Sequence, residues 1–413
     1  MLINFNGVDK IEAPTKTMSN RNNALRIEIV DSSEKFALLQ QAWTNLLDEA
    51  LDASIFMSWD WQYYWWKYYG NNQPLRLLLV FEEDGGLVGV LPLYINTIKL
   101  FKIFPVRIVK FVGVGGDTSP DYLGPVLKNC YSREIASALI NYILNSLKGW
   151  DVIELIDMHD NSVFATAFSE ICSARNIIFR RGISANISYI NLPQSWKEYL
   201  NSLHRDRRFK IRYYRKKLEK NHNVKFFVIK DEKHIDFFID NLIRLHHLRW
   251  KNRASEYAFS SQEYVGFHRD VIYSLAKKDC IRFYCIEIDD KAVAIKYCYK
   301  FRGGIFFFQF GFDPNFEKLG LGQVLLGYAI EHAILESNTI FDFLKGEYEY
   351  KKIWAKEITR TIYLRIYPKW NIFIALFFIR LEVNPKFKHF ALKLRRIFWR
   401  PKDVISSKLK YTA

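Results

Sequence analysis

Cysteine is scarce in this chain of 413 residues, and its positions form no recognisable framework. The number is odd and no Cys-x-x-Cys pair occurs; the cysteines are Cys130, Cys172, Cys280, Cys285 and Cys298. Disulfide scaffolds and structural zinc sites both need regularly spaced cysteines. The sequence therefore predicts reduced thiols in a hydrophobic core, as in a cytoplasmic protein.

Long apolar runs are also lacking. A bilayer-spanning helix needs about 20 mostly apolar residues, whereas the longest apolar run here is 372–379. The first residues, MLINFNGVDKIEAPTK, contain no apolar core of a secretion signal. We therefore expect a cytoplasmic protein, with peripheral contact at the inner membrane face as a further hypothesis.

Several catalytic signatures are absent as well. The chain has no His-Glu-x-x-His and no Gly-x-Ser-x-Gly, so the sequence gives no sign of zinc-protease or serine-hydrolase chemistry. No Lys-Ser/Thr follows the main glycine turn, and its third glycine is missing, which argues against a P-loop and a dinucleotide fingerprint. We expect no metal.

Positive charge, by contrast, is abundant. Lys and Arg number 60 against 44 acids, for a net charge of +16, and aromatic residues reach 16%. This balance favours an anionic partner such as nucleic acid, a membrane face or a phosphorylated small molecule. A generally basic protein without such a partner is the alternative.

The order of expected elements predicts an α/β (α+β) fold with mixed central sheets flanked by helices. We divide the chain into a leader (1–23), an N-terminal domain (24–185), a second domain (186–367) and a basic aromatic tail (368–413). The succession of helices and strands recurs loosely in both halves, which suggests a pseudo-repeat. Helices are expected at 32–51, 57–70, 133–147, 195–220, 233–250, 263–277 and 323–335, and strands at 25–30, 75–81, 87–94, 106–114, 152–156, 187–192, 224–229, 281–288, 292–301, 305–312, 339–344 and 361–367.

The most informative segment begins with a glycine turn before an apolar helix. Gly320, Leu321, Gly322 and Gln323 open the helix expected at 323–335. Backbone N–H groups and the positive dipole end of a helix attract anions, and glycines let a pyrophosphate approach closely. The turn therefore predicts a phosphate-bearing ligand, although a tight strand–helix connection would give the same pattern.

A strand and a charged turn follow this helix. Alternation places Asp342 on one strand face and its neighbours Phe341 and Phe343 on the other. Asp342 and Glu347 are the acid/base candidates, and Lys351 is a candidate electrostatic stabiliser. The alternative is a capped helix start with a solvated Glu/Lys pair.

Together, GFDPNFEKLGLGQVLL, FDFLKGEYEYKKIWA and SWKEYLNSLHRDRRFKIRYYRKKLEK resemble the acetyltransferase domain of the BioF/CelD-like branch of the GNAT superfamily. That branch is related to the FemAB peptidyltransferases. The resemblance covers residues 190–360, and the N-terminal half, with SWDWQYYWW, is similar to the first domain of such proteins. It implies tandem GNAT-like domains, the second of them catalytic.

The resemblance also implies a reaction and its site. The donor is acetyl-CoA or another acyl-CoA, the acceptor is a primary amine, and transfer is direct without a metal. Gly320–Gln323 would hold the donor pyrophosphate, Arg208 and Arg212 would contact an anionic acceptor, and Tyr350 and Trp354 would lie with the substrate.

The expected function is therefore acyl-CoA-dependent N-acylation of an amino sugar, a cell-envelope polysaccharide or a lipid-linked precursor. Two alternatives stay open. One is FemAB-type aminoacyl transfer from tRNA. The other is a non-catalytic protein that binds nucleic acid or an anionic membrane through the basic segment 205–217 or through the tail at 368–402.

Overall fold

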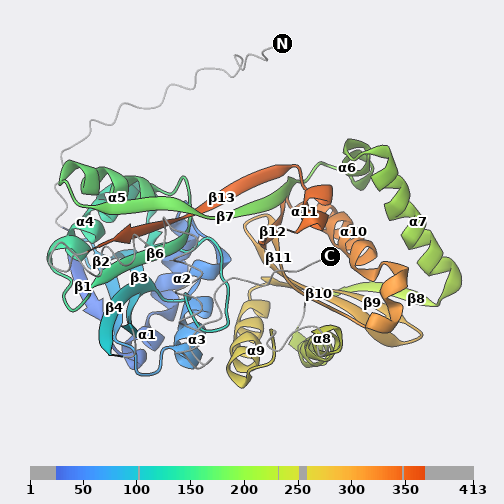
Figure 1. Ribbon diagram of the computed structural model, residues 1–413, viewed down its shortest axis with the longest axis horizontal. Helices are drawn as coiled ribbons and strands as arrows, with labels where there is room; N and C mark the ends of the chain where they lie inside the picture. Colours follow the sequence, from blue (N-terminus) through green and yellow to red (C-terminus); the bar gives the residue numbers. More distant parts are fainter. Residues whose placement is uncertain (1–24, 101–102, 231, 251–257, 347, 368–413) are drawn as a thin grey trace, which may run out of the picture.

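One mixed β-sheet runs from β1 to β13 through the described part of the chain and carries helices on its faces (Figure 1). The computed structural model describes residues 25–100, 103–230, 232–250, 258–346 and 348–367. The 13-stranded sheet has the order β1-β2-β3-β4-β6-β13-β7-β12-β11-β10-β9-β8, and β5 pairs with β3. The predicted α/β class with a mixed sheet and flanking helices is confirmed.

The elements follow the hydrophobic periodicity of the sequence in most places. The strands are β1 (Arg26–Val30), β2 (Leu75–Phe81), β3 (Leu87–Leu100), β4 (Phe104–Phe111), β5 (Val126–Leu127), β6 (Val152–His159), β7 (Phe179–Asn191), β8 (Val224–Ile229), β9 (Ile281–Ile288), β10 (Lys291–Phe301), β11 (Gly304–Phe312), β12 (Ile340–Lys345) and β13 (Glu357–Ile366). The α-helices are α1 (Ser33–Leu38), α2 (Gln40–Glu49), α3 (Trp59–Tyr69), α4 (Ser132–Asn145), α5 (Val163–Ala174), α6 (Trp196–Ser202), α7 (Arg205–Asn221), α8 (Ile235–Trp250), α9 (Gln262–Ala276), α10 (Leu321–Leu335) and α11 (Glu349–Trp354).

Some expectations differ from the structure. The single helices expected at 32–51 and 195–220 are each divided in two, because Leu39 and the segment 203–204 interrupt them. Helix α5 and the first half of β7 were not predicted. The leader and the tail lie outside the described residues.

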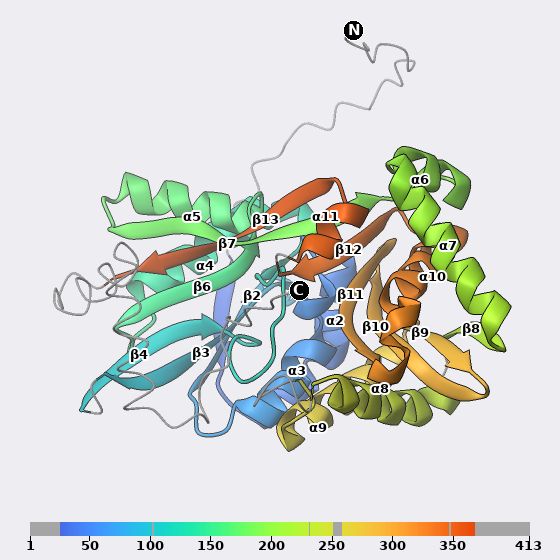
Figure 2. The ribbon, with the colours of Figure 1, turned by 45° about the vertical axis from the view of Figure 1, so that its right-hand side comes forward.

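Both halves of the chain repeat one topology and then exchange their last strands. In each half, four strands pair in antiparallel order, and the fourth then pairs in parallel with a fifth: β4 with β6, and β11 with β12. Strand β7 follows the first half but pairs with β12, and β13 follows the second half but pairs with β6. The two exchanged strands pair with each other along the connection between the halves (Figures 1 and 2). The expected boundary at 185/186 falls within β7.

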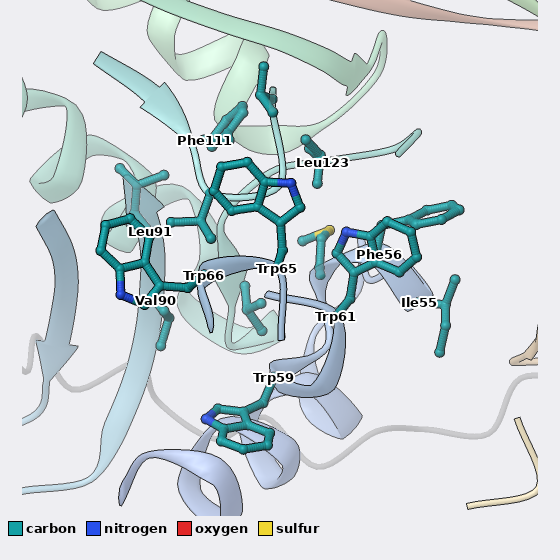
Figure 3. Close-up of a cluster of buried hydrophobic side chains, with 14 of the residues drawn as sticks. Ile55, Phe56, Trp59, Trp61, Trp65, Trp66, Val90, Leu91, Phe111 and Leu123 are labelled. Atoms are coloured by element: carbon teal, nitrogen blue, oxygen red, sulfur yellow. The ribbon is translucent and has the colours of Figure 1, made fainter. Parts of the chain in front are cut away.

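The aromatic helix α3 forms much of the core of the first half (Figure 3). It starts at Ser58, whose hydroxyl accepts a hydrogen bond from the Trp61 amide, and it ends at Gly70. Trp65 and Trp66 lie beside residues of β3 and β4, whereas Trp61 packs edge-on against Phe56. Asp60, on the same helix, is buried and pairs with Lys278 at 2.7 Å, which ties the first half to the second. The burial of the large tryptophan side chains of α3 is strongly stabilising.

Within the described ranges, we find no helix of the length and hydropathy that crossing a bilayer requires.

Candidate active site

The parallel strands β11 and β12 separate after a short stretch of pairing. Gly304, Ile305 and Phe306 pair with Ile340, Phe341 and Asp342. Beyond these positions β11 continues beside β10 and β12 continues beside β7. The sheet therefore opens between two neighbouring strands, at the carboxyl end where ligands of α/β sheets commonly bind.

The glycine turn lies at the start of α10, the helix that connects these two strands. Gly320 is the N-cap and has a φ of 67°, a left-handed conformation that a side chain would strain. Gly322 has no such φ, and a Cβ there would lie 3.2 Å from Phe310 Cε1. The first amide groups of a helix have no intrahelical acceptor and are suited to an anion. The structure thus places the four predicted turn residues, 320–323, at a helix start beside the opened strands.

Asp342 lies on β12 at the point where the strands separate. Its side chain is buried, and Phe341 and Phe343 face the opposite core, as the alternation predicts. Oδ2 accepts from the Tyr122 hydroxyl at 2.7 Å and Oδ1 accepts from the Leu344 amide at 2.6 Å. Burial raises the pKa of Asp342 to about 7, although both hydrogen bonds favour the charged form. The group is therefore matched to proton transfer near neutral pH.

Tyr122 is a site residue that the sequence interpretation did not identify. It comes from the loop after β4, and its φ of 54° turns the chain toward β12. Its carbonyl accepts from Ser54 Oγ at 2.8 Å, and its ring stacks on His159. Burial, with Asp342 as the next cause, raises the pKa of Tyr122, so its hydroxyl stays protonated and donates to the carboxylate. The glycine- and proline-rich loop GVGGDTSPDYLGP was a signal for an unusual backbone, but not for this contact.

A buried ion cluster holds the Tyr122 loop against β12. The Lys345 Nζ donates to Asp157 Oδ2 at 2.8 Å and to the Pro120 carbonyl at 2.8 Å, and it lies 3.5 Å from Asp121 Oδ1. The Lys345 amide donates to Asp121 Oδ2 at 2.8 Å. Burial raises the pKa of Asp121 to about 6 against the lowering effect of Lys345. The two halves of the chain are thus joined by charge pairing next to Asp342.

Lys351 lies on α11, and its buried side chain donates hydrogen bonds to the backbone. Its Nζ donates to the carbonyls of Phe343 at 2.8 Å, Leu344 at 2.8 Å and Lys345 at 3.0 Å. Leu344 has a φ of 55°, so this end of β12 departs from regular strand geometry. Lys351 therefore fixes the turn whose Leu344 amide orients Asp342.

Replacing Lys351 with methionine should leave three carbonyls without their donor. A buried acceptor that loses its partner costs about 1–3 kcal/mol, so the free energy of unfolding in urea should fall by that amount. Lys352→Met is the matched control, because Lys352 is exposed and pairs with the exposed Glu349; it should stay within about 0.5 kcal/mol of the parent. Equal stability of the two variants would contradict the structural role of Lys351.

A cavity of about 540 Å³ lies on the Asp342 side of the sheet. Both halves contribute to it: Tyr122 and Ser54 come from the first, and Phe306, Asp342 and Asn191 come from the second or from β7. The acidic and basic residues of its described lining are Asp52, His159 and Asp342, with the phenols of Tyr122 and Tyr189 beside them, and that lining includes neither Lys nor Arg. The cavity can therefore receive a neutral or cationic group next to a proton acceptor.

The other predicted residues lie elsewhere. Arg208 and Arg212 are on α7, which packs through Ile211 with α10 on the face of the sheet opposite the cavity. Trp354 is buried in the core beside α10, and Tyr350 is partly exposed and stacks on Tyr348. Glu347 lies outside the described residues.

Among the residues that the structure describes, no group of three or more His, Cys, Asp or Glu side chains is placed to hold a metal ion.

Part of the chain matches a known protein family. Residues 205–352 match the family described as acetyltransferase (GNAT) domain. The chain has a GNAT fold. The matched segment contains the glycine turn, Asp342 and Lys351, whereas Tyr122 lies outside it.

Solved structures extend the similarity of fold to both halves of the chain. The crystal structure of FemX aligns with a TM-score of 0.56 at 10% identity, covering 85% of this chain and 99% of the other. The structure of L-PGS from Bacillus licheniformis aligns with a TM-score of 0.50 at 12% identity, covering 88% and 97%. At sequence identities this low, the similarity to these structures concerns the fold alone. No curated protein sequence matches the chain.

Proposed function

We propose that this protein transfers an acyl group from a thioester donor to a primary amine bound in the cavity. The observation that carries the proposal is Asp342, a buried carboxyl with a pKa of about 7 that lines the cavity where β11 and β12 separate. A proton acceptor of this kind is what aminolysis of a thioester needs, because the ammonium form of an amine is not a nucleophile.

The reaction balances without further groups. Asp342 takes a proton from the acceptor ammonium, and the freed amine attacks the carbonyl carbon. The C–N bond forms, the C–S bond breaks, and the thiolate leaves and takes up the second proton that the nitrogen loses when it becomes an amide. Backbone amides of β11 are the candidate donors to the oxyanion, because this strand has a bulge at Phe308 opposite Tyr297 and Cys298 and has lost β12 as a neighbour.

An acyl-CoA, with acetyl-CoA as the simplest case, is the proposed donor. The start of α10 would receive its pyrophosphate, and the thioester would lie in the opening between β11 and β12. Transfer of an aminoacyl group from a tRNA ester is the alternative donor chemistry, and it would use the same carboxyl and the same opening.

The cavity chemistry supports an acceptor that is uncharged apart from its amine. Asn161, Tyr189 and Asn191 bring neutral hydrogen-bonding groups to the lining, and Asp52 and Asp342 bring carboxyls. This set suits an amino sugar or a hydroxyl-bearing part of an envelope precursor better than a phosphate. A lipid-linked acceptor and a cytoplasmic location stay predictions, as does membrane contact of 368–402.

Calorimetric titration of acetyl-CoA and CoA tests the donor. The parent protein should bind both, and Gly322→Asp should weaken binding at least about tenfold, equivalent to about 1.4 kcal/mol. An added carboxylate at the helix start competes for the same amides but favours the helix itself. Gly322→Ala is the control, because it adds the same Cβ near Phe310 without charge.

Absence of CoA binding to the parent would overturn the acyl-CoA donor. Binding of an aminoacyl-tRNA mimic in the same titration would then support aminoacyl transfer as the alternative.

One observation favours a second candidate function, nucleic-acid binding by α7. Phe209 and Tyr213 are 67% and 48% exposed and stack on one another, and Lys217 lies over the Tyr213 ring. Stacking rings among cations suit single-stranded RNA. Steeply salt-dependent RNA binding without CoA binding would favour this candidate.

A further inference from the structure

Lys296 is a buried cation without a counter-charge. It lies on β10 with 2% of its surface exposed, and its Nζ is 4.1 Å from the ring centre of Phe307 and 3.9 Å from that of Phe310. Within the described residues it makes neither a hydrogen bond nor an ion pair. Burial, with the charge of Arg249 as a smaller cause, lowers the pKa of the ammonium to about 7.

The other fully buried cations of the described chain behave differently. Arg282 pairs with Asp279 and Glu336, and Lys351 donates to three carbonyls. Contacts with aromatic rings offset part of the cost of burying a charge, but a buried charge without a partner remains destabilising. A residue that destabilises the fold in this way is a candidate for binding.

A second cation reaches the same ring from another element. Arg249, in the last turn of α8, donates from Nη1 to the Phe310 carbonyl at 3.2 Å, and its guanidinium lies 5.4 Å from the Phe310 ring centre. This carbonyl belongs to the part of β11 that has separated from β12. Arg249 therefore lies at the opening between the strands.

The Phe310 ring also touches the glycine turn. Its Cε1 is 3.2 Å from the place that a Cβ on Gly322 would occupy. Lys296, Arg249 and the first turn of α10 thus meet around one ring, and all three carry positive charge or a positive dipole end. An anion in their midst would supply the counter-charge that Lys296 lacks.

We propose that Lys296 and Arg249 form, with the start of α10, a binding site for an anionic group of the acyl donor. The proposal rests on the proposed function and adds the residues that select the donor. Two anionic groups have this chemistry: the phosphates of CoA, and a carboxylate at the end of a dicarboxylic acyl chain such as succinyl.

Calorimetry with four probes tests the site: CoA, acetyl-CoA, succinyl-CoA and inorganic pyrophosphate. Lys296→Met keeps the length of the side chain and removes the charge. We expect it to weaken donor binding at least about tenfold and to raise the Tm, because a buried uncompensated charge is removed. A merely structural lysine would not show this opposite pair of effects. Lys300→Met, on the same strand, is the matched control; Lys300 pairs with Asp279 at 3.1 Å, and its loss should leave donor binding unchanged.

The pattern of losses identifies the anionic group. Equal weakening of CoA, acetyl-CoA and succinyl-CoA would assign Lys296 to the phosphates, whereas a loss confined to succinyl-CoA would assign it to an acyl carboxylate. Unchanged binding of all donors by Lys296→Met would overturn the proposal and leave the proposed function intact.

Failure of the proposed function gives a different result. A parent protein that binds no CoA compound but binds pyrophosphate in a Lys296-dependent manner would keep the anion site and exclude the CoA donor. A parent protein that binds none of the four probes would overturn both.

Discussion

Replacing Asp342 with asparagine is expected to lower kcat for acyl transfer by about 10²–10⁴-fold, the usual contribution of a general base. Asparagine has nearly the same shape: its Oδ1 can accept from the Leu344 amide and its Nδ2 can donate to the Tyr122 hydroxyl oxygen, but it cannot accept a proton from the ammonium. Donor affinity in calorimetry should stay the same. Asp289→Asn, in the exposed β9–β10 turn, is the matched control and should keep full activity. An Asp342→Asn variant with parental kcat would exclude Asp342 as the base.

The same substitution should change the pH profile of activity and the pH profile of stability. With a pKa of about 7 in the folded protein, Asp342 becomes a competent base only as the pH rises through 7, so the parent activity should increase there and the variant should lose that step. The pH dependence of stability has the opposite sign to that of activity. The folded-state pKa lies above the unfolded value of about 3.9, so the folded state retains a proton that the unfolded chain releases. The contribution of Asp342 to stability is therefore lost as the pH rises from about 4 to 7.

Differential scanning calorimetry checks that sign. The Tm of Asp342→Asn relative to the parent should be higher at pH 8 than at pH 4. The raised pKa of Asp121 acts in the same direction and is present in both proteins, so it cancels in the difference except for its interaction with the Asp342 charge. A constant difference between pH 4 and pH 8 would contradict the raised pKa of Asp342.

Lys345→Met is expected to destabilise the protein by about 3–5 kcal/mol, because removing one member of a buried ion cluster leaves uncompensated charges. Asp121 is fully buried, and Asp157 is largely so; both depend on the Lys345 ammonium. Urea unfolding measures the loss. Lys225→Met is the control, since Lys225 forms an exposed pair with Asp290 and its loss should leave the stability close to that of the parent.

A double variant separates the charge effect from lost packing. Adding Asp121→Asn to Lys345→Met removes one uncompensated carboxylate and should recover part of the stability, with a coupling of about 0.5–3 kcal/mol. Strictly additive losses would mean that the ion pair contributes nothing. Because the cluster holds the Tyr122 loop against Asp342, the single variant should also lower kcat more than it changes donor affinity.

Several features of the candidate site follow from local sequence. Period-two alternation placed Asp342 on the face opposite Phe341 and Phe343, and the structure has it so. Glycines before an apolar run predicted the start of α10, and the structure has Gly320 as its N-cap. Strands β8 and β9 were predicted with the bounds that they have.

The contacts of these residues could not be predicted in the same way. Lys351 was a candidate electrostatic stabiliser, whereas all three of its hydrogen bonds go to backbone carbonyls at the end of β12. Arg208 and Arg212 looked like acceptor contacts, yet the cavity beside Asp342 is on the other side of the sheet. No pattern around Lys296 indicated that it would be buried without a carboxylate.

The sequence by itself determined the elements, the α/β class and the glycine turn, because helix and strand periodicity and backbone freedom are properties of neighbouring residues. Only the tertiary structure decided that β7 and β13 exchange places between the halves and that the loop with Asp121 and Tyr122 meets Asp342 and Lys345. These pairs are more than 200 residues apart in the chain. Their contacts, and the pKa of about 7 that burial gives Asp342, depend on which surfaces pack together over the whole sheet.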